Sequence, residues 1–256
     1  MHIFLNTNGR LVRGAPTPNL IWSGVRVHSE GIHPEENSRP TLTNRMLKIF
    51  KKIDLTIDDE EILRLLAHQK RKEKPSKTKL SSLIEETKAL SKKLLHPQGM
   101  FEVVDKEALK SEKCFEQTDK VALGLCTIGD ELENKISELN QKGELAQAVI
   151  LDAIGSVAAE STADFVNLQI CEWCKKRGLS TSQRFSPGYG NWSLGGQKFI
   201  FSLLPAERIK VKLNQSCMMI PRKSVSFAIK IGEEFEGLKK IRVCEICNLK
   251  NCLYRK

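Results

Sequence analysis

Residues 145–177 read LAQAVILDAIGSVAAESTADFVNLQICEWCKKR, and this stretch is the strongest helix signal in the chain. Apolar and small side chains recur in it at spacings of three and four, which places them on one side of a helix. These residues are Ala146, Val149, Ile150, Ile154, Val157, Ala158 and Ala163. The stretch therefore predicts one long helix with a packing face of small residues.

Shorter patterns on both sides of this helix predict a mixed fold. Residues 53–66 and 80–95 have apolar side chains at helical spacing, whereas residues 121–126 form a short apolar run that is typical of a buried strand. Residues 209–213 and 225–231 alternate between apolar and other side chains, as strands do. We therefore predict a single α+β domain over residues 44–243.

The residues outside this domain differ from it in composition. Residues 1–43 contain Asn8-Gly9, several prolines and little periodicity, which predicts an N-terminal extension of loop or disorder. Residues 244–256 form a short cysteine-rich tail.

The composition limits the partners. The chain has 256 residues with 41 Lys or Arg and 31 Asp or Glu, which gives a net charge of +10 and permits an anionic partner. Aromatic residues make up only 6% of the chain, too few for a platform that stacks single-stranded nucleic acid. No apolar run reaches the roughly 18 residues of a membrane span, and residues 1–28 lack the apolar core of a secretory signal. We expect a cytoplasmic protein without nucleic-acid or membrane partners.

Histidine is confined to the N-terminal part of the chain, and the last of the five is His96. The predicted helix and the segments after it therefore contain no histidine for a Ser-His-Asp or Cys-His arrangement, unless the N-terminal part folds back to supply one. We assign no catalytic residue.

Residues 183–192, QRFSPGYGNW, combine the features of a ligand-binding loop. Arg184 offers a guanidinium that can bind a carboxylate or phosphate through two hydrogen bonds. Pro187 stiffens the turn, Gly188 lets the backbone approach a ligand, and Tyr189 adds a ring with a polar tip. An ordinary surface turn is the alternative interpretation of the same residues.

Three ordered motifs resemble the activation domain of cobalamin-dependent methionine synthase. They are LDAIGSVAAE at residues 151–160, the pattern Arg-x-x-x-Gly-Tyr at residues 184–189, and SCMMIPRKSVS at residues 216–226. The likeness is weaker between residues 47 and 145, where it begins with Ile53-Asp54. The resemblance implies a twisted antiparallel sheet flanked by helices.

The resemblance also implies a function. Members of that family bind S-adenosylmethionine and present its methyl group to cobalamin in the oxidised cob(II) state, with an electron from a flavodoxin- or ferredoxin-type donor. By position, Arg184 would hold the ligand carboxylate, and Gly188 and Tyr189 would line the pocket. Glu160 would pair with the ligand's amino group, and Asp54 would be a second acid. A cation and an acid together suit the zwitterionic end of this ligand.

Two features distinguish this chain from the family. The family sequence Ala-Met-Trp-Pro-Gly-Ala corresponds here to CMMIPRK at residues 217–223, which adds the cations Arg222 and Lys223 and a thiol. The full-length enzyme also has homocysteine, folate and cobalamin modules, which 256 residues do not accommodate. The resemblance therefore implies one subunit of a split methionine synthase or related corrinoid methyltransferase, active only with a cobalamin-binding partner.

The tail has three cysteines with the spacing C-x2-C-x4-C, namely Cys244, Cys247 and Cys252. Closely spaced thiols in a reduced compartment suit zinc or an iron–sulfur cluster. A four-ligand site needs one more thiolate, and we expect Cys217 to supply it because neighbouring cations would favour its ionised form. The pair Cys171 and Cys174 is the alternative source. The tail therefore leaves two other functions open, namely an iron–sulfur electron-transfer activator of a corrinoid protein and a non-catalytic adaptor.

Overall fold

The computed structural model describes residues 46–68, 77–109, 112–115 and 118–233. It also describes two short strands, β1 (His2–Leu5) and β2 (Leu11–Gly14), which pair antiparallel with each other. The remainder of residues 1–43 and the cysteine tail lie outside the described residues, so the expectations for these segments stay predictions.

Five strands form an antiparallel sheet in the order β3-β4-β5-β9-β6. They are β3 (Met46–Phe50), β4 (Gln98–Asp105), β5 (Lys120–Thr127), β6 (Ser180–Thr181) and β9 (Ser224–Gly232). A separate hairpin joins β7 (Lys212–Leu213) to β8 (Met219–Ile220). The antiparallel sheet with its helices confirms the predicted α+β class.

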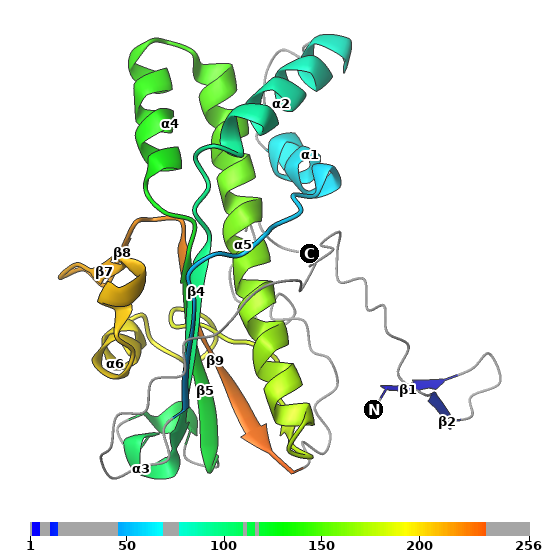
Figure 1. Ribbon diagram of the computed structural model, residues 1–256, viewed down its shortest axis with the longest axis vertical. Coiled ribbons are helices and arrows are strands. Elements are labelled where there is room, and N and C mark those ends of the chain that lie inside the picture. The colour runs from blue at the N-terminus through cyan, green and yellow to red at the C-terminus, as the bar shows by residue number, and fades with distance from the viewer. Residues whose placement is uncertain are drawn as a thin grey trace.

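The longest helix, α5 (Leu145–Lys175), has 31 residues and confirms the helix predicted for residues 145–177. The other helices are α1 (Asp59–His68), α2 (Lys77–Ser91), α3 (Lys106–Leu109), α4 (Glu131–Gln141) and α6 (Gly196–Leu203), with 3-10 turns η1 (Lys113–Phe115) and η2 (Ala206–Ile209). Figure 1 shows α5 running along one side of the sheet and α6 on the other. Among the described helices, none has the length and apolar character needed to cross a membrane.

The sheet separates two apolar cores because successive side chains of a strand point to opposite faces. Leu123 and Leu125 of β5 belong to the core that includes Ile200 of α6. Ala122 faces the other way and belongs to the core that includes Val166 of α5. The central strands are therefore covered on both faces, and α5 is the main cover of one of them.

Helices α1, α2 and α4 pack on the first half of α5 (Figure 1). Gly155 of α5 permits a close approach there, since a Cβ at this position would lie 2.8 Å from Cδ2 of Leu132 in α4. The same Cβ would lie 3.4 Å from Cε of Lys223. Two of the three sequence motifs, residues 151–160 and 216–226, therefore meet at Gly155.

One sequence expectation about the strands needs correction, and two strands were not expected. Residues 209–213 are not one strand, because η2 ends at Ile209 and Lys210 adopts a left-handed φ of 58°. The apparent alternation arises because Ile209 and Val211 are both buried at the ends of this turn. Strands β3 and β4 were not predicted, since β4 is buried along most of its length and so lacks the polar alternation that marks a half-exposed strand.

Candidate functional site

The arginine of the predicted ligand loop meets the predicted helix glutamate. Nη2 of Arg184 lies 2.7 Å from Oε2 of Glu160 and 3.5 Å from Oδ1 of Asp164. The two acids are four residues apart on α5, so their carboxylates lie on the same side of the helix. Two predicted site residues thus form one charge cluster with Asp164. The spacing of four from Glu160 was the sequence signal by which Asp164 could have been found.

The guanidinium of Arg184 is enclosed by the sheet as well as by α5. Its Cζ lies 5.4 Å from the centroid of the Phe227 ring, and the side chain is 21% exposed. Burial by itself would lower the pKa of Arg184, but the charges of Glu160 and Asp164 outweigh burial and raise this pKa above its ordinary value. Arg184 is therefore a permanent cation.

One hydrogen-bond donor of the Arg184 guanidinium has no acceptor among the described residues. Nη1 of Arg184 is buried and has no hydrogen-bond partner within the described part of the chain. A buried charged donor without an acceptor is costly, by about 1–3 kcal/mol or more. The guanidinium therefore has hydrogen-bonding capacity that its described neighbours do not use.

The loop that carries Arg184 folds back in a tight turn. Gly188 has a φ of +90°, which favours glycine, and its N–H donates to the carbonyl of Trp192 at 2.8 Å. The indole Nε1 of Trp192 in turn donates to Oε2 of Glu112 at 2.9 Å. Tyr189, at the tip, is 50% exposed. The turn thus presents an accessible ring on a backbone that is anchored to the domain, and the pocket-lining role expected for Gly188 and Tyr189 stays a prediction.

The third motif is attached to α5 through Lys223. Its Nζ lies 2.7 Å from Oδ1 of Asp152 and 2.8 Å from Oγ of Ser156, both within residues 151–160. Nε of Arg222 lies 3.5 Å from Oε2 of Glu133 in α4. The two additional cations therefore bind helix carboxylates, and all three motifs of the resemblance converge on α5.

Asp54 lies in the segment between β3 and α1, and it is exposed. Its neighbours Ile53 and Leu55 pack into the cores beside α5. No contact between Asp54 and Arg184 is found among the described residues. The role predicted for Asp54 stays a prediction.

The described cysteines do not gather at one point. Cys217 has a left-handed φ of 59° in the turn of the β7–β8 hairpin, whereas Cys171 and Cys174 lie at the end of α5. Figure 1 places this hairpin and the end of α5 on opposite sides of the sheet. Within the described residues, no group of three or more His, Cys, Asp or Glu is placed to hold a metal ion. Because the tail lies outside these residues, the metal site of Cys217, Cys244, Cys247 and Cys252 stays a prediction.

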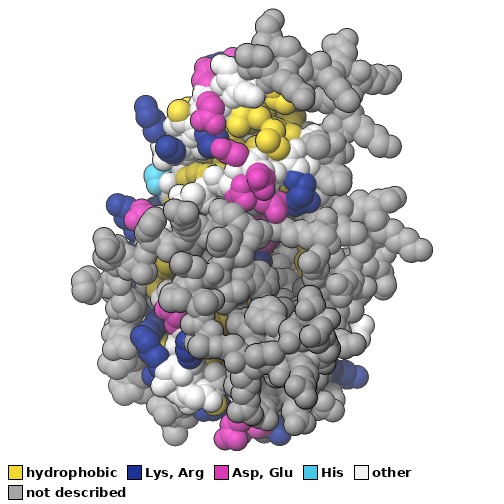
Figure 2. Space-filling view, turned by 90° about the vertical axis from the view of Figure 1, so that its right-hand side faces the viewer, with side chains coloured by type: hydrophobic (Ala, Val, Ile, Leu, Met, Phe, Trp, Pro, Cys, Tyr) yellow, Lys and Arg dark blue, Asp and Glu magenta, His cyan; other side chains and the backbone are white. Residues whose placement is uncertain are grey.

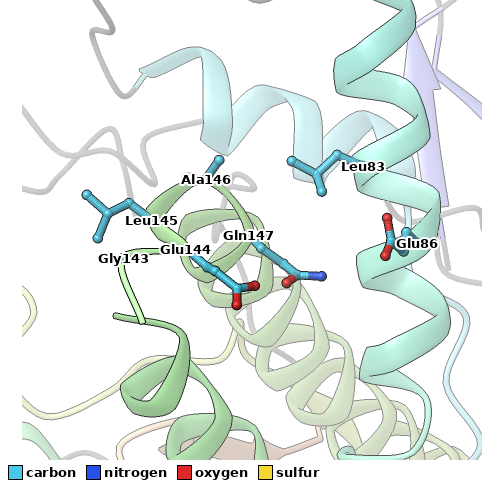
Figure 3. Close-up of a pocket in the computed structure, with 7 residues that line it drawn as sticks. All are labelled: Leu83, Glu86, Gly143, Glu144, Leu145, Ala146 and Gln147. Carbon is cyan, nitrogen blue, oxygen red and sulfur yellow. The ribbon is translucent and has the colours of Figure 1, made fainter. Parts of the chain in front are cut away.

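Two hollows lie at opposite ends of α5, and Arg184 lines neither. One, of about 370 Å³, lies between α2 and the start of α5, and in Figure 3 Leu83 and Gln147 face each other across it while Leu145 points away. The other, of about 250 Å³, lies beside β3 at the last turns of α5. In Figure 2, exposed apolar side chains gather in the upper part of the molecule, at the level where Figure 1 shows α1 and α2. Neither of these two hollows includes Arg184, so the candidate site is defined, within the described part of the chain, by its charges and its unpaired donor.

Comparison with known proteins gives a match at the level of structure. No family model matches the sequence, and no curated protein matches it. A solved structure of the MetH reactivation domain bound to AdoHcy is similar, with a TM-score of 0.52 over 70% of this chain and 75% of that chain. This chain has the reactivation-domain fold. The resemblance to the methionine synthase activation domain is thus confirmed as a similarity of fold. The identity is 13%, so the match by itself carries no ligand or activity over to this chain.

Proposed function

We propose that this chain is an S-adenosylmethionine-binding activation subunit, which supports reductive remethylation of a cobalamin carried by a partner protein. The observation that carries the proposal is the buried, unpartnered Nη1 of Arg184 beside Glu160, in a chain with the reactivation-domain fold. The similar domain binds AdoHcy, which differs from S-adenosylmethionine by one methyl group. The two ligands share the amino-acid end that Arg184 and Glu160 would recognise.

The residues of the charge cluster divide the recognition of a zwitterion between them. Nη1 of Arg184 would donate to the ligand carboxylate, since this is the donor without a partner in the described residues. Glu160 has a side chain that is 57% exposed, so one carboxylate can pair with Arg184 and still accept from a ligand ammonium. Gly188 and the ring of Tyr189 would line the remainder of the pocket. Asp54 is proposed as a second acid on the strength of the sequence resemblance alone.

The methylation of the partner's cobalamin determines how this chain would have to hold the ligand. When bound, S-adenosylmethionine would supply its sulfonium methyl group to cobalamin that has first gained one electron and passed from the cob(II) to the cob(I) state, leaving S-adenosylhomocysteine. A flavodoxin- or ferredoxin-type protein would supply the electron, and the net charge of +10 suits an acidic donor of this kind. The residues named here would hold the amino-acid end of the ligand and so orient the methyl group toward the partner.

Calorimetry with S-adenosylmethionine tests the proposal. We expect the wild-type chain to bind the ligand, and Arg184→Ala to weaken binding by about 1.5–3 kcal/mol, the usual scale for a hydrogen bond to a charged group. Arg64→Ala is the matched control, because Arg64 forms an ion pair with Glu61 on α1, outside the charge cluster. Equal affinities of the wild type and Arg184→Ala would contradict the assignment of Arg184, and no binding by the wild type would contradict the proposed function.

The spacing of the tail cysteines supports a second candidate, an iron–sulfur electron-transfer activator of a corrinoid protein. Anaerobically purified protein would then contain near-stoichiometric iron, which would be lost on truncation after Val243. If Cys217→Ser also loses the metal, Cys217 is the fourth ligand. If Cys217→Ser keeps the metal and the truncated chain loses it, the fourth ligand is Cys171 or Cys174. Metal that is retained in both variants would rule out the tail site.

A further inference from the structure

Gly124 lies in the middle of β5, where its backbone conformation does not require a glycine. Its φ is outside the left-handed region. Glycine in the interior of a strand weakens the strand and commonly marks the close approach of another group. The reason for a glycine at this position must therefore be the group that packs against it.

The group above Gly124 is the ring of Phe227. The two residues are direct partners in the pairing of β5 with β9. A Cβ at Gly124 would lie 2.3, 2.5 and 2.7 Å from Cζ, Cε2 and Cε1 of the ring. The end of the ring thus occupies the space that any side chain at position 124 would need. Phe227 is fully buried, so its ring has little room to move elsewhere.

The same ring lies against the guanidinium of the candidate site. The separation of 5.4 Å between Cζ of Arg184 and the ring centroid is within the range of a cation–π contact. Glu160 and Asp164 hold the guanidinium from α5. Arg184 is therefore confined between a ring on the sheet and two carboxylates on the helix, and the position of the ring depends on residue 124.

We propose that Gly124 is a positioning residue of the S-adenosylmethionine site, which acts on Arg184 through the ring of Phe227. A side chain at position 124 displaces the ring, and the ring displaces the guanidinium from the place where Nη1 meets the ligand carboxylate. The effect on the ligand rests on the proposed function. The effect on Arg184 does not, because the contacts that transmit it exist without a ligand.

The position of Arg184 can be measured without a ligand. The Nε–H proton of an arginine beside an aromatic ring has a ring-current shift in its ¹H–¹⁵N spectrum, and Arg184→Lys identifies the signal. We expect this signal to move in Gly124→Ala and to lose its ring-current shift in Phe227→Leu. Gly155→Ala is the control, since its added methyl group meets Leu132 instead of Phe227. An unmoved signal in Gly124→Ala, or in Phe227→Leu should Gly124→Ala fail to fold, overturns the proposal.

A double-mutant cycle measures the consequence for ligand binding. We expect Gly124→Ala to weaken S-adenosylmethionine binding by at least about fivefold in the wild-type background, and by less than about twofold when residue 227 is Leu. Equal losses in the two backgrounds would overturn the route through Phe227. If the wild type does not bind S-adenosylmethionine and the Arg184 signal still moves, the positioning of Arg184 by Gly124 is supported and only the proposed ligand fails.

Discussion

Arg184 has two acidic neighbours, an aromatic neighbour and one buried donor without a partner among the described residues. Two acids and a ring can stabilise a cation in a largely buried position, but they do not satisfy all five of its donors. This unused hydrogen-bonding capacity at a single residue is the basis on which we propose that Arg184 recognises a ligand carboxylate.

The buried cysteines allow a prediction at the same scale. Burial raises the pKa of Cys126 and of Cys174 to about 12, so both thiols stay protonated at pH 8. We expect iodoacetamide to leave both unmodified in the native protein and to label both after unfolding, as measured by mass spectrometry of peptides. Labelling of either residue at the rate of an unfolded peptide would contradict the packing of α5 against the sheet.

The same shift predicts a pH dependence of stability. The unfolded thiol of Cys126 ionises near its ordinary pKa of 9.0, whereas the folded thiol ionises near 12. Between these values the unfolded state loses a proton that the native state keeps, so the free energy of unfolding falls as pH rises from 9 toward 12. Cys126→Ala removes this contribution, so its denaturation midpoint should fall less steeply than that of the wild type over this range.

At the scale of elements, α5 joins the parts of the domain. It covers one face of the sheet, supports α1, α2 and α4, and holds the ligand loop through Glu160 and the β8–β9 connection through Asp152. Its small residues make this possible because they let neighbours approach the helix axis closely, as Gly155 does for Leu132.

Lys223→Met tests the connection between β9 and α5. The lysine side chain is 16% exposed, and its Nζ bonds three groups of the first half of α5. We expect the free energy of unfolding to fall by about 1–2 kcal/mol. This loss is smaller than for a fully buried ion pair, because Asp152 is partly exposed to solvent. Arg222→Met is the control, since this side chain is 65% exposed and its loss should cost less than about 0.5 kcal/mol in the same urea titration. Equal effects of both substitutions would contradict the role of Lys223.

At the scale of the whole molecule, residues 46–233 contain four apolar cores. The sheet, its covering helices and all three motif segments are contained in the same range. Residues 46–233 therefore have extensive buried apolar surface of their own, as cooperative folding requires.

A chain that starts at Met46 tests this statement. We expect it to unfold cooperatively, with a midpoint within a few degrees of that of the full-length protein, as followed by circular dichroism at 222 nm. A broad transition in the shorter chain would show that the N-terminal extension is part of the core.

The sequence by itself determined what depends on neighbours along the chain. The spacing of small and apolar residues specifies α5, and the alternation at residues 225–231 specifies β9, because helical and extended backbones repeat every 3.6 and every two residues. The loop residues Arg184, Gly188 and Tyr189 were proposed as site residues from their side-chain chemistry, which is also local to the sequence. The resemblance of three short motifs also indicated the fold, which the structure bears out.

Only the tertiary structure decided which of these groups meet. The pairing of Arg184 with Glu160 and Asp164 joins positions that are 24 and 20 residues apart in sequence, and the cover of Gly124 by Phe227 depends on the register of β5 with β9. Strand β4 escaped prediction because it is buried on both faces, and the edge strand β3 is defined by its pairing with β4; neither property leaves a periodic pattern in the strand itself. The unpartnered donor of Arg184 is likewise a property of packing, since the sequence specifies which donors a residue has but not which acceptors lie within reach.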